Sequence, residues 1–539
     1  MLPFQDGKWR VPPTRRTIPP VFGPRSAAGL SAIALLLINL PYLAAPELPP
    51  SQSTFSGFLL NPTDGYSYLA KMRQGASGPL EFHLPYGPEP GDGAMLFVYY
   101  LLLGRLASLV GLAPQTVYQA ARVMGTAAMF GAAYLFFARM LPSERARFGA
   151  FALALFGTGV GWLAVPFGLT GIDLQVPEAI PFVTGYVNAH FPVAVALILF
   201  SVTAIVSGYP AWLTYLASLG LALIQPFGSL TVAASLAAWV LVEAVRRSRA
   251  AGHPASDPTV ETWRAQWMGL LVFLLGAIPI LIYDFGAIRS HPGLGAWAAQ
   301  NATPSPSLPE TLLGYGLLVP LAVIGSIRAR LRGSAEARLL LSWVVVNGLL
   351  LYAPFLLQRR LSLGLFFPLA ALAGLGLEQV AVSNRRLTLL VVGTLVLSLP
   401  SHGLVIASGL SSVARGDPAL VVDRPEQELV RWIDRDLTDS ELILAGPRTG
   451  NRLPAFTAAR VLYGHPFETP AAEHQLAEVN RLFRWDQEPG AGIARLQELG
   501  VRYVFYSSEE RSIGSPNWIP ELELVQEVGA GRLYKVPIP

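Results

Sequence analysis

The sequence predicts an α-helical polytopic membrane protein with about eleven transmembrane helices, followed by a small C-terminal α/β domain. Of the 539 residues, 52% are hydrophobic and 14% are charged, and the mean hydropathy is +0.44. Soluble domains carry about 25% charged residues. Apolar runs long enough to cross a bilayer recur up to about residue 411, and the sequence after that point has the composition of a soluble domain.

The cysteine count and the charge exclude several kinds of function. The chain has no cysteine, which excludes disulfides, thiolate metal sites, a cysteine nucleophile and lipidation on cysteine. The net charge of +4 is small, and most arginines between residues 27 and 411 lie in short loops between apolar runs. Such arginines are a topology signal, and they argue against nucleic acid as a partner.

The apolar runs define the predicted transmembrane domain, residues 27–411. Its spans are 27–45, 117–139, 147–168, 189–208, 210–226, 228–245, 267–285, 310–327, 338–357, 361–381 and 387–411. The first run follows a basic leader, residues 1–26, and could be taken for a signal peptide. Pro46 directly after the run disfavours cleavage there, so we expect a retained span.

A further apolar run, residues 94–112, carries Arg105 in its middle, which is costly for a true span. Five basic groups lie in loops that the positive-inside rule places in the cytoplasm: the leader, Arg139 with Arg145 and Arg147, Arg246 with Arg247 and Arg249, Arg328 with Arg330, Arg332 and Arg338, and Arg385 with Arg386. All five are cytoplasmic only if 94–112 does not cross. We therefore expect an interfacial or re-entrant helix there, within one large external loop, residues 46–115.

The same parity places the C-terminal domain, residues 412–539, outside the cytoplasm of a plasma-membrane protein. Six short strands are predicted in it, at 419–422, 441–445, 460–463, 502–506, 522–527 and 532–536. Three helices are predicted at 426–436, 471–483 and 492–499. The domain has no phosphate-binding glycine loop.

Residues 61–75, "NPTDGYSYLAKMRQG", open the polar part of the external loop. Thr63 or Asp64 can cap a short helix that has Tyr66, Leu69 and Met72 on one side. Asp64 then either only caps this helix or is a functional carboxylate held near the lipid boundary.

Several other polar residues fall on the external side at a similar depth. They are His83 and Asp92 in the first loop, Glu178 in the second, and His190, Gln225, Arg289, His291, Arg359 and Arg360 near the outer ends of spans. Arg359 and Arg360 break the positive-inside pattern. A phosphate at the headgroup level would explain the exception, because arginine binds phosphate through two parallel hydrogen bonds. Contact with bulk membrane lipids is the alternative.

The sequence does not decide whether the protein binds a metal ion. The seven histidines show no metal-ligand spacing on one helix, which argues against a fixed zinc site. Asp64 with other external carboxylates could hold one divalent cation, Mg²⁺ or Mn²⁺, although nothing in the sequence requires it.

Residues 61–75, the run 94–112 and the stretch "VYQAARVMG" at 117–125 resemble the GT-C superfamily of polytopic glycosyltransferases. That superfamily includes protein O-mannosyltransferases, the aminoarabinose transferase of lipid A and oligosaccharyltransferases. Its members share a large first external loop with interfacial helices and an acidic residue early in that loop. Many also have a C-terminal external domain.

The resemblance implies transfer, by inverting chemistry, of a sugar from a polyprenyl-phosphate donor to a glycan, lipid or protein outside the cytoplasm. It implies that Asp64 is the general base or a metal-linked carboxylate. The residues implied to bind the donor phosphate are Arg359, Arg360, Arg289 and His291. His190 is implied to bind a sugar hydroxyl or the phosphate, and Glu178, His83, Asp92 and Gln225 are further candidates for substrate binding because they fall on the same external side. Gly65 follows Asp64 where many relatives carry a second acidic residue, so the resemblance does not settle metal dependence.

Two other classes of function fit a polytopic chain. A transporter or flippase would place ionisable groups near the middle of the bilayer and show inverted repeats, whereas the candidate charges here lie at the outer boundary. A non-catalytic membrane scaffold of the same fold would need none of them.

Overall fold

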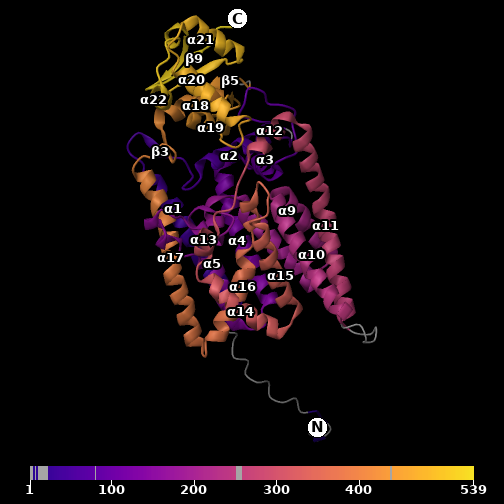
Figure 1. Cartoon of the computed structure of the whole chain (residues 1–539). Helices are drawn as coiled ribbons and strands as arrows, with labels where there is room; N and C mark the ends of the chain where they lie inside the picture. Colours follow the sequence, from indigo (N-terminus) through magenta and orange to yellow (C-terminus); the bar gives the residue numbers. More distant parts are fainter. Residues whose placement is uncertain are drawn as a thin grey trace.

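A computed structural model describes residues 4–5, 8–9, 22–78, 80–249, 258–437 and 440–538. A bundle of long helices carries the C-terminal α/β region at one end, where it lies over α2, α3 and α12 (Figure 1). Most of the predicted leader lies outside the described residues. Within it, β1 (Phe4–Gln5) pairs with β2 (Lys8–Trp9).

The helices up to residue 249 are α1 (Pro24–Ala44), α2 (Pro62–Ser77), α3 (Val98–Val110), α4 (Pro114–Met140), α5 (Glu144–Phe156), α6 (Ile172–Gln175), α7 (Pro181–Val187), α8 (His190–Ser207), α9 (Ala211–Ile224) and α10 (Pro226–Arg249). The following helices are α11 (Pro258–Ser290), α12 (Pro292–Gln300), α13 (Leu308–Tyr315), α14 (Leu318–Arg332), α15 (Ala335–Leu350), the 3₁₀ turn η4 (Gln358–Ser362), α16 (Phe366–Val380) and α17 (Asn384–Ala414).

Among the described residues, six helices are long and apolar enough to cross a membrane, namely α1, α4, α8, α10, α11 and α17. The pair α13 and α14, bent by 79°, would make a seventh span. The apolar helices α3, α9 and α16 are shorter. The chain is thus an integral membrane protein, and the count of about eleven spans stays a prediction.

Two predicted spans are interrupted for local reasons. In the run 147–168 the α-helix ends at Phe156, because three glycines within residues 157–161 disfavour its continuation, and only two short 3₁₀ turns follow. The run 310–327 breaks at Gly316, whose φ of +49° is readily adopted only by glycine.

The helix α3 forms within the run 94–112, whose interfacial placement stays a prediction. Its 13 residues span about 20 Å, less than the roughly 30 Å hydrocarbon core. It packs closely on α2: a Cβ on Gly75 would lie 2.0 Å from the carbonyl oxygen of Leu101, and one on Gly104 would lie 1.7 Å from that of Met72. Glycine at both positions therefore sets how the two helices cross.

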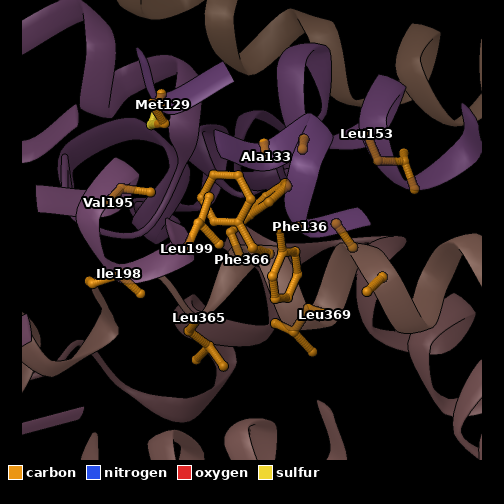
Figure 2. Close-up of a cluster of buried hydrophobic side chains, with 14 of the residues drawn as sticks. Met129, Ala133, Phe136, Leu153, Val195, Ile198, Leu199, Leu365, Phe366 and Leu369 are labelled. Atoms are coloured by element: carbon orange, nitrogen blue, oxygen red, sulfur yellow. The ribbon is translucent and has the colours of Figure 1, made fainter. Parts of the chain in front are cut away.

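The core of the bundle is formed by α4, α8 and α16. Figure 2 shows the facing side chains Met129, Ala133 and Phe136 of α4, Val195, Ile198 and Leu199 of α8, and Leu365, Phe366 and Leu369 at the start of α16. In a bilayer, close packing and not water exclusion holds such helices together. This packing holds the outer ends of α4, α8 and α16 in fixed positions relative to one another.

The C-terminal region contains a five-stranded sheet in the order β6-β5-β7-β9-β8. Its elements are β4 (Val421–Asp423), α18 (Arg424–Asp436), β5 (Leu442–Leu444), α19 (Pro447–Phe456), β6 (Arg460–Val461), α20 (Ala472–Phe483), α21 (Pro489–Glu498), β7 (Tyr503–Tyr506), α22 (Ser508–Ile513), β8 (Glu523–Val528) and β9 (Gly531–Lys535). The strand β5 runs parallel to β6 and β7, and β9 runs antiparallel to β7 and β8.

The strand positions agree with the six predicted, with one difference in pairing. The strand β4 does not join the sheet but pairs antiparallel with β3 (Ser53–Phe55) of the first loop. The helices α19 and α22 were not predicted. The helical pattern of α19 is hard to recognise in the sequence, because its ten residues include Pro447, Gly450 and Pro454.

The C-terminal region is attached to the first loop by the pairing of β4 with β3, and to α2 by two ion pairs. Arg73 pairs with Asp434 of α18 at 2.6 Å, and Lys71 pairs with Glu468, after β6, at 2.8 Å. The backbone of Tyr86 bridges to Val461 of β6. The loop that follows β6 is thereby placed beside the start of α2.

Candidate active site

A cavity of about 620 Å³ lies where α2, the start of α3, the α9–α10 junction, α11, α12, η4 and the loop after β6 meet. Its polar lining residues are Asn61, Asp64, Tyr68, Tyr99, Tyr100, Gln175, His190, Gln225, Asp284, Asn301, Thr303, Arg359, Arg360, His465 and Glu468. Its apolar lining includes Leu223, Ile224, Phe227, Ile288 and Trp297. The cavity therefore combines a charged part with an apolar wall.

Asp64 lies in the first turn of α2 but does not cap the helix. The N-cap residue is Asn61, held at a left-handed φ of 53°, and no side chain accepts a backbone N–H there. One carboxylate oxygen of Asp64, Oδ1, lies 3.0 Å from Nε2 of His465, and the other, Oδ2, accepts from the Asn61 amide. The carboxylate therefore faces the cavity with both oxygens held by side-chain donors.

The hydrogen bonds of His465 identify its tautomer. Its Nδ1 accepts from the backbone N–H groups of Phe467 and Glu468, each at 3.1 Å. A nitrogen that accepts cannot carry the proton, so Nε2 carries it and donates to Asp64. Burial raises the pKa of Asp64, but the bonds from His465 and Asn61 and the charge of Arg360 outweigh burial, and the pKa lies below its usual value. The carboxylate is thus ionised at neutral pH.

A buried ion pair lies next to Asp64. The Nζ of Lys71, whose side chain is 0% exposed, is 2.8 Å from both carboxylate oxygens of Glu468, and Ser67 donates to the same carboxylate at 2.7 Å. The ammonium also lies over the Phe97 ring, 4.4 Å from its centroid. Burial raises the pKa of Glu468, yet the charge and hydrogen bonds of Lys71, together with the Ser67 hydroxyl, bring it below its usual value. Glu468 is thus a carboxylate at the cavity wall with its charge already balanced.

Stacked aromatic rings form another side of the cavity. Tyr68 and Tyr100 stack at 4.4 Å between centroids with 9° between their planes, and Tyr118 extends the stack. The Tyr100 hydroxyl and Nδ1 of His190 share a hydrogen bond of 2.6 Å. His190 is therefore a cavity residue held by Tyr100, as the sequence led us to expect of its position.

Arg359 and Arg360 line the cavity from η4 and are half-buried. Neither forms an ion pair within the part of the chain that the structure describes. The Arg360 guanidinium lies over the Phe227 ring at 5.5 Å, and Nε of Arg359 is buried without a hydrogen-bond partner among the described residues. Two cations in a half-buried wall that form no ion pair among the described residues favour an anionic ligand.

The remaining candidates divide into one that lines the cavity and five that do not. Gln225 is buried at the end of α9 and lines it. Two of the other five are exposed: Arg289, which lies over the Phe285 ring, and Asp92. His291 caps α12 through Nδ1, and the His83 ring faces Gly93. Glu178 is buried away from the cavity. Predicted membrane depth does not fix which face of a helix or loop a residue occupies, and that is why these five were misplaced.

The sequence reasoning missed Asn61, Tyr68, Tyr100, His465 and Glu468. His465 lies 401 residues from Asp64, so no local pattern connects them. A usable signal existed: His465 follows the strand predicted at 460–463, and polar residues at the carboxyl ends of parallel strands commonly form sites.

The predicted divalent cation does not fit these residues. No group of three or more His, Asp or Glu side chains among the described residues is placed to hold a metal ion. Both oxygens of Asp64 face N–H donors, the Nε2 of His465 carries a proton, and Glu468 is bound by Lys71. Neither His465 nor Glu468 is therefore free to act as a second ligand for a cation at Asp64.

No protein-family model and no curated protein matches the sequence. Several solved structures match the fold. The oligosaccharyltransferase of Archaeoglobus fulgidus, tethered with an acceptor peptide, gives a TM-score of 0.53 at 13% identity, over 96% of this chain and 75% of that one. ArnT from Cupriavidus metallidurans bound to undecaprenyl phosphate gives 0.51 at 12% identity, over 95% and 98%.

The arabinofuranosyltransferase AftD from Mycobacteria gives a TM-score of 0.53 at 14% identity, over 96% of this chain and 42% of that one. The three are membrane glycosyltransferases, and each match extends over nearly all of this chain. At such low identity the likeness concerns the fold. The chain therefore has the fold of the GT-C membrane glycosyltransferases.

Proposed function

We propose that the protein is a glycosyltransferase that moves a sugar from a polyprenyl-phosphate donor to an acceptor outside the cytoplasm. The observation that carries this proposal is one cavity lined both by the ionised Asp64 and by Arg359 and Arg360, which form no ion pair among the described residues. The fold likeness to ArnT bound to undecaprenyl phosphate supports a lipid-phosphate donor.

The two parts of the cavity suit the two parts of such a donor. The phosphate would lie against Arg359 and Arg360, and the polyprenyl chain would follow the apolar wall of Leu223, Ile224 and Phe227. Guanidinium groups held in a half-buried wall bind phosphate oxygens in pairs and need little reorganisation as charge develops.

The chemical step follows from the position of Asp64. A hydroxyl of the acceptor attacks the anomeric carbon on the face opposite the phosphate, and its proton passes to Asp64 over about 3 Å. The bond between the anomeric carbon and the phosphate oxygen breaks, and the oxygen keeps the electron pair. The products are the glycosylated acceptor with inverted configuration and polyprenyl phosphate. Arg359 and Arg360 stabilise the charge on the departing phosphate.

We place the cavity and the C-terminal region on the extracytoplasmic side of the plasma membrane. Contacts connect the helix ends that carry basic residues expected in the cytoplasm: Arg139 pairs with Glu336, Arg338 pairs with Glu243, and Arg145 donates to the carbonyl of Ala381. The helix ends that carry them lie away from the C-terminal region (Figure 1). This arrangement supports the predicted orientation.

A turnover assay separates the proposed function from a flippase and from a scaffold. Proteoliposomes would carry the purified protein and a panel of polyprenyl-phosphate sugars labelled in the sugar, and membranes from cells lacking the gene would supply the acceptor. A transferase moves the label off the lipid and releases polyprenyl phosphate. With a flippase, the label stays on the lipid and changes leaflet. A scaffold does neither, and either of these results would refute the proposal.

A further inference from the structure

The segment Gly464–Thr469 is the part of the C-terminal region that enters the cavity, and it is tightly folded. The Thr469 hydroxyl accepts from the backbone N–H groups of Gly464 and His465, at 3.3 and 3.1 Å, and the N–H of Thr469 donates to the His465 carbonyl at 3.0 Å. The ring of His465 stacks on Tyr86, 6.1 Å between centroids. This loop therefore presents the imidazole in one fixed orientation.

Two contacts join this loop to the helix that carries Asp64. His465 donates to Asp64 in the first turn of α2, and Glu468 binds Lys71 two turns later. The loop and the helix are thus connected at two points, about 10 Å apart along α2. The position of the Asp64 carboxylate depends on both.

We propose that His465 is a positioning residue for the transfer reaction: its Nε2–H holds the Asp64 carboxylate as the proton acceptor and occupies the place that a divalent cation would take. This inference rests on the proposed function. It also makes the C-terminal region a part of the reaction centre.

The hydrogen bonds define what each group can do. His465 cannot take the acceptor's proton, because the lone pair of its Nδ1 faces the N–H groups of Phe467 and Glu468. Each oxygen of Asp64 accepts one bond, from His465 or Asn61, and an ionised carboxylate oxygen has room for a second. Asp64 therefore keeps a free acceptor site for the substrate hydroxyl.

The same bonds act against a metal ion. A histidine nitrogen must be deprotonated to ligate a metal, and here deprotonating Nε2 would require a proton on Nδ1, where it would face two backbone N–H groups. The lone pairs that remain on Asp64 do not make up a binding site, since Glu468 is bound by Lys71 and Ser67. The transfer then proceeds without a divalent cation.

The pH dependence follows from the groups around Asp64. Those with charge or a titratable proton are Arg360 from η4, His190 from α8, Tyr68 and Lys71 from α2, Tyr86 from the first loop, Tyr100 from α3, and His465 and Glu468 from the C-terminal loop. The His465 bond lowers the pKa of Asp64. Its removal raises that pKa, so the acid limb of the pH–rate profile moves to higher pH.

The experiment compares His465→Ala, His465→Gln and the control His474→Ala, whose side chain is exposed. In His465→Ala we expect kcat to fall about 10- to 100-fold, an unchanged KM for the lipid donor, and an acid limb at higher pH. Glutamine can place an N–H close to that of Nε2, so His465→Gln should recover part of the loss. Unchanged kcat and pH profile in His465→Ala would overturn the positioning role.

Two further measurements are made on the wild-type protein and do not compare the activities of variants. With ¹⁵N-histidine labelling, and His465→Gln to assign the signal, the proton should reside on Nε2. Titration with Mn²⁺ should show no saturable binding at this site, and a chelator should leave turnover unchanged. A proton on Nδ1, or turnover that is lost to the chelator and restored by Mn²⁺, would overturn the inference. Absence of any transfer would instead refute the proposed function.

Discussion

Lys71 holds the C-terminal loop against α2, and replacing it by methionine tests that role. The ammonium is 0% exposed and the Glu468 side chain is 12% exposed. Without Lys71, Glu468 retains only the Ser67 hydroxyl as a donor. A buried carboxylate that has lost its partner avoids much of the penalty by taking up a proton.

The cost of that proton sets the expected magnitude. The ordinary pKa of a glutamate is 4.5, so protonating it at pH 7 costs about 3.4 kcal/mol, and at pH 5 about 0.7 kcal/mol. In the wild type, the lowered pKa of Glu468 contributes stability above the unfolded value, and this stability is lost only as the pH falls through the folded value. In Lys71→Met, the pKa of Glu468 in the folded protein is raised above its unfolded value, so the stability of the variant falls as the pH rises. The difference between the two proteins should shrink from pH 7 to pH 5.

Hydrogen exchange measured by mass spectrometry reports the effect locally. At pH 7 the amides of residues 464–469 should lose protection by about two orders of magnitude in Lys71→Met, which corresponds to about 3 kcal/mol. Arg73→Met is the matched control, two residues away on α2. Its pair with Asp434 is 31% and 42% exposed, and such pairs contribute about 0–1 kcal/mol. Equal losses in the two variants, or a loss that does not depend on pH, would refute the reasoning.

Three further predictions concern the cavity and its side of the membrane. Arg360→Gln should raise the KM for the lipid donor about 10- to 100-fold, because a charged hydrogen bond contributes about 1.5–3 kcal/mol, and should change the KM for the acceptor much less; equal effects on both substrates would argue against a phosphate contact. Because the pKa of Asp64 lies below the usual carboxyl range, wild-type kcat/KM should stay level as the pH falls to about 5 and decline only below it, and a decline centred near neutral pH would indicate another proton acceptor. Ala113 is exposed at the start of α4, and since the chain has no cysteine, Ala113→Cys in intact cells should react with a membrane-impermeant maleimide; protection until the cells are broken open would place 94–112 across the membrane.

The local elements were predictable from the sequence to the extent that local patterns determine them. The helix at 61–75 appears as α2, and the strands at 441–445 and 502–506 appear as β5 and β7. These segments have their own start signals and apolar periods. The spans were less predictable, because hydropathy marks apolar runs but does not show where glycine breaks them, as at Gly316.

The site was predictable only in part. Asp64, His190, Gln225, Arg359 and Arg360 line one cavity as expected. Arg289 and Asp92 do not, because depth in the membrane fixes one coordinate of a residue and leaves its direction open. The position of His465 after a predicted strand marked it as a candidate, but its contact with Asp64 could not be predicted, since it depends on the pairing of β3 with β4 and on the Lys71–Glu468 contact. These long-range contacts have no signature in a single sequence.

The most direct test of the account is the turnover of Asp64→Asn in proteoliposomes, measured as the release of polyprenyl phosphate from a labelled lipid-linked sugar. Asp92→Asn is the control, because Asp92 lies on the same loop but is exposed and does not line the cavity. We expect Asp64→Asn to bind the lipid and to lose turnover by at least about 100-fold, and Asp92→Asn to match the wild type. If Asp64→Asn releases polyprenyl phosphate at the wild-type rate, the carboxylate is not the proton acceptor and the proposed reaction centre is wrong.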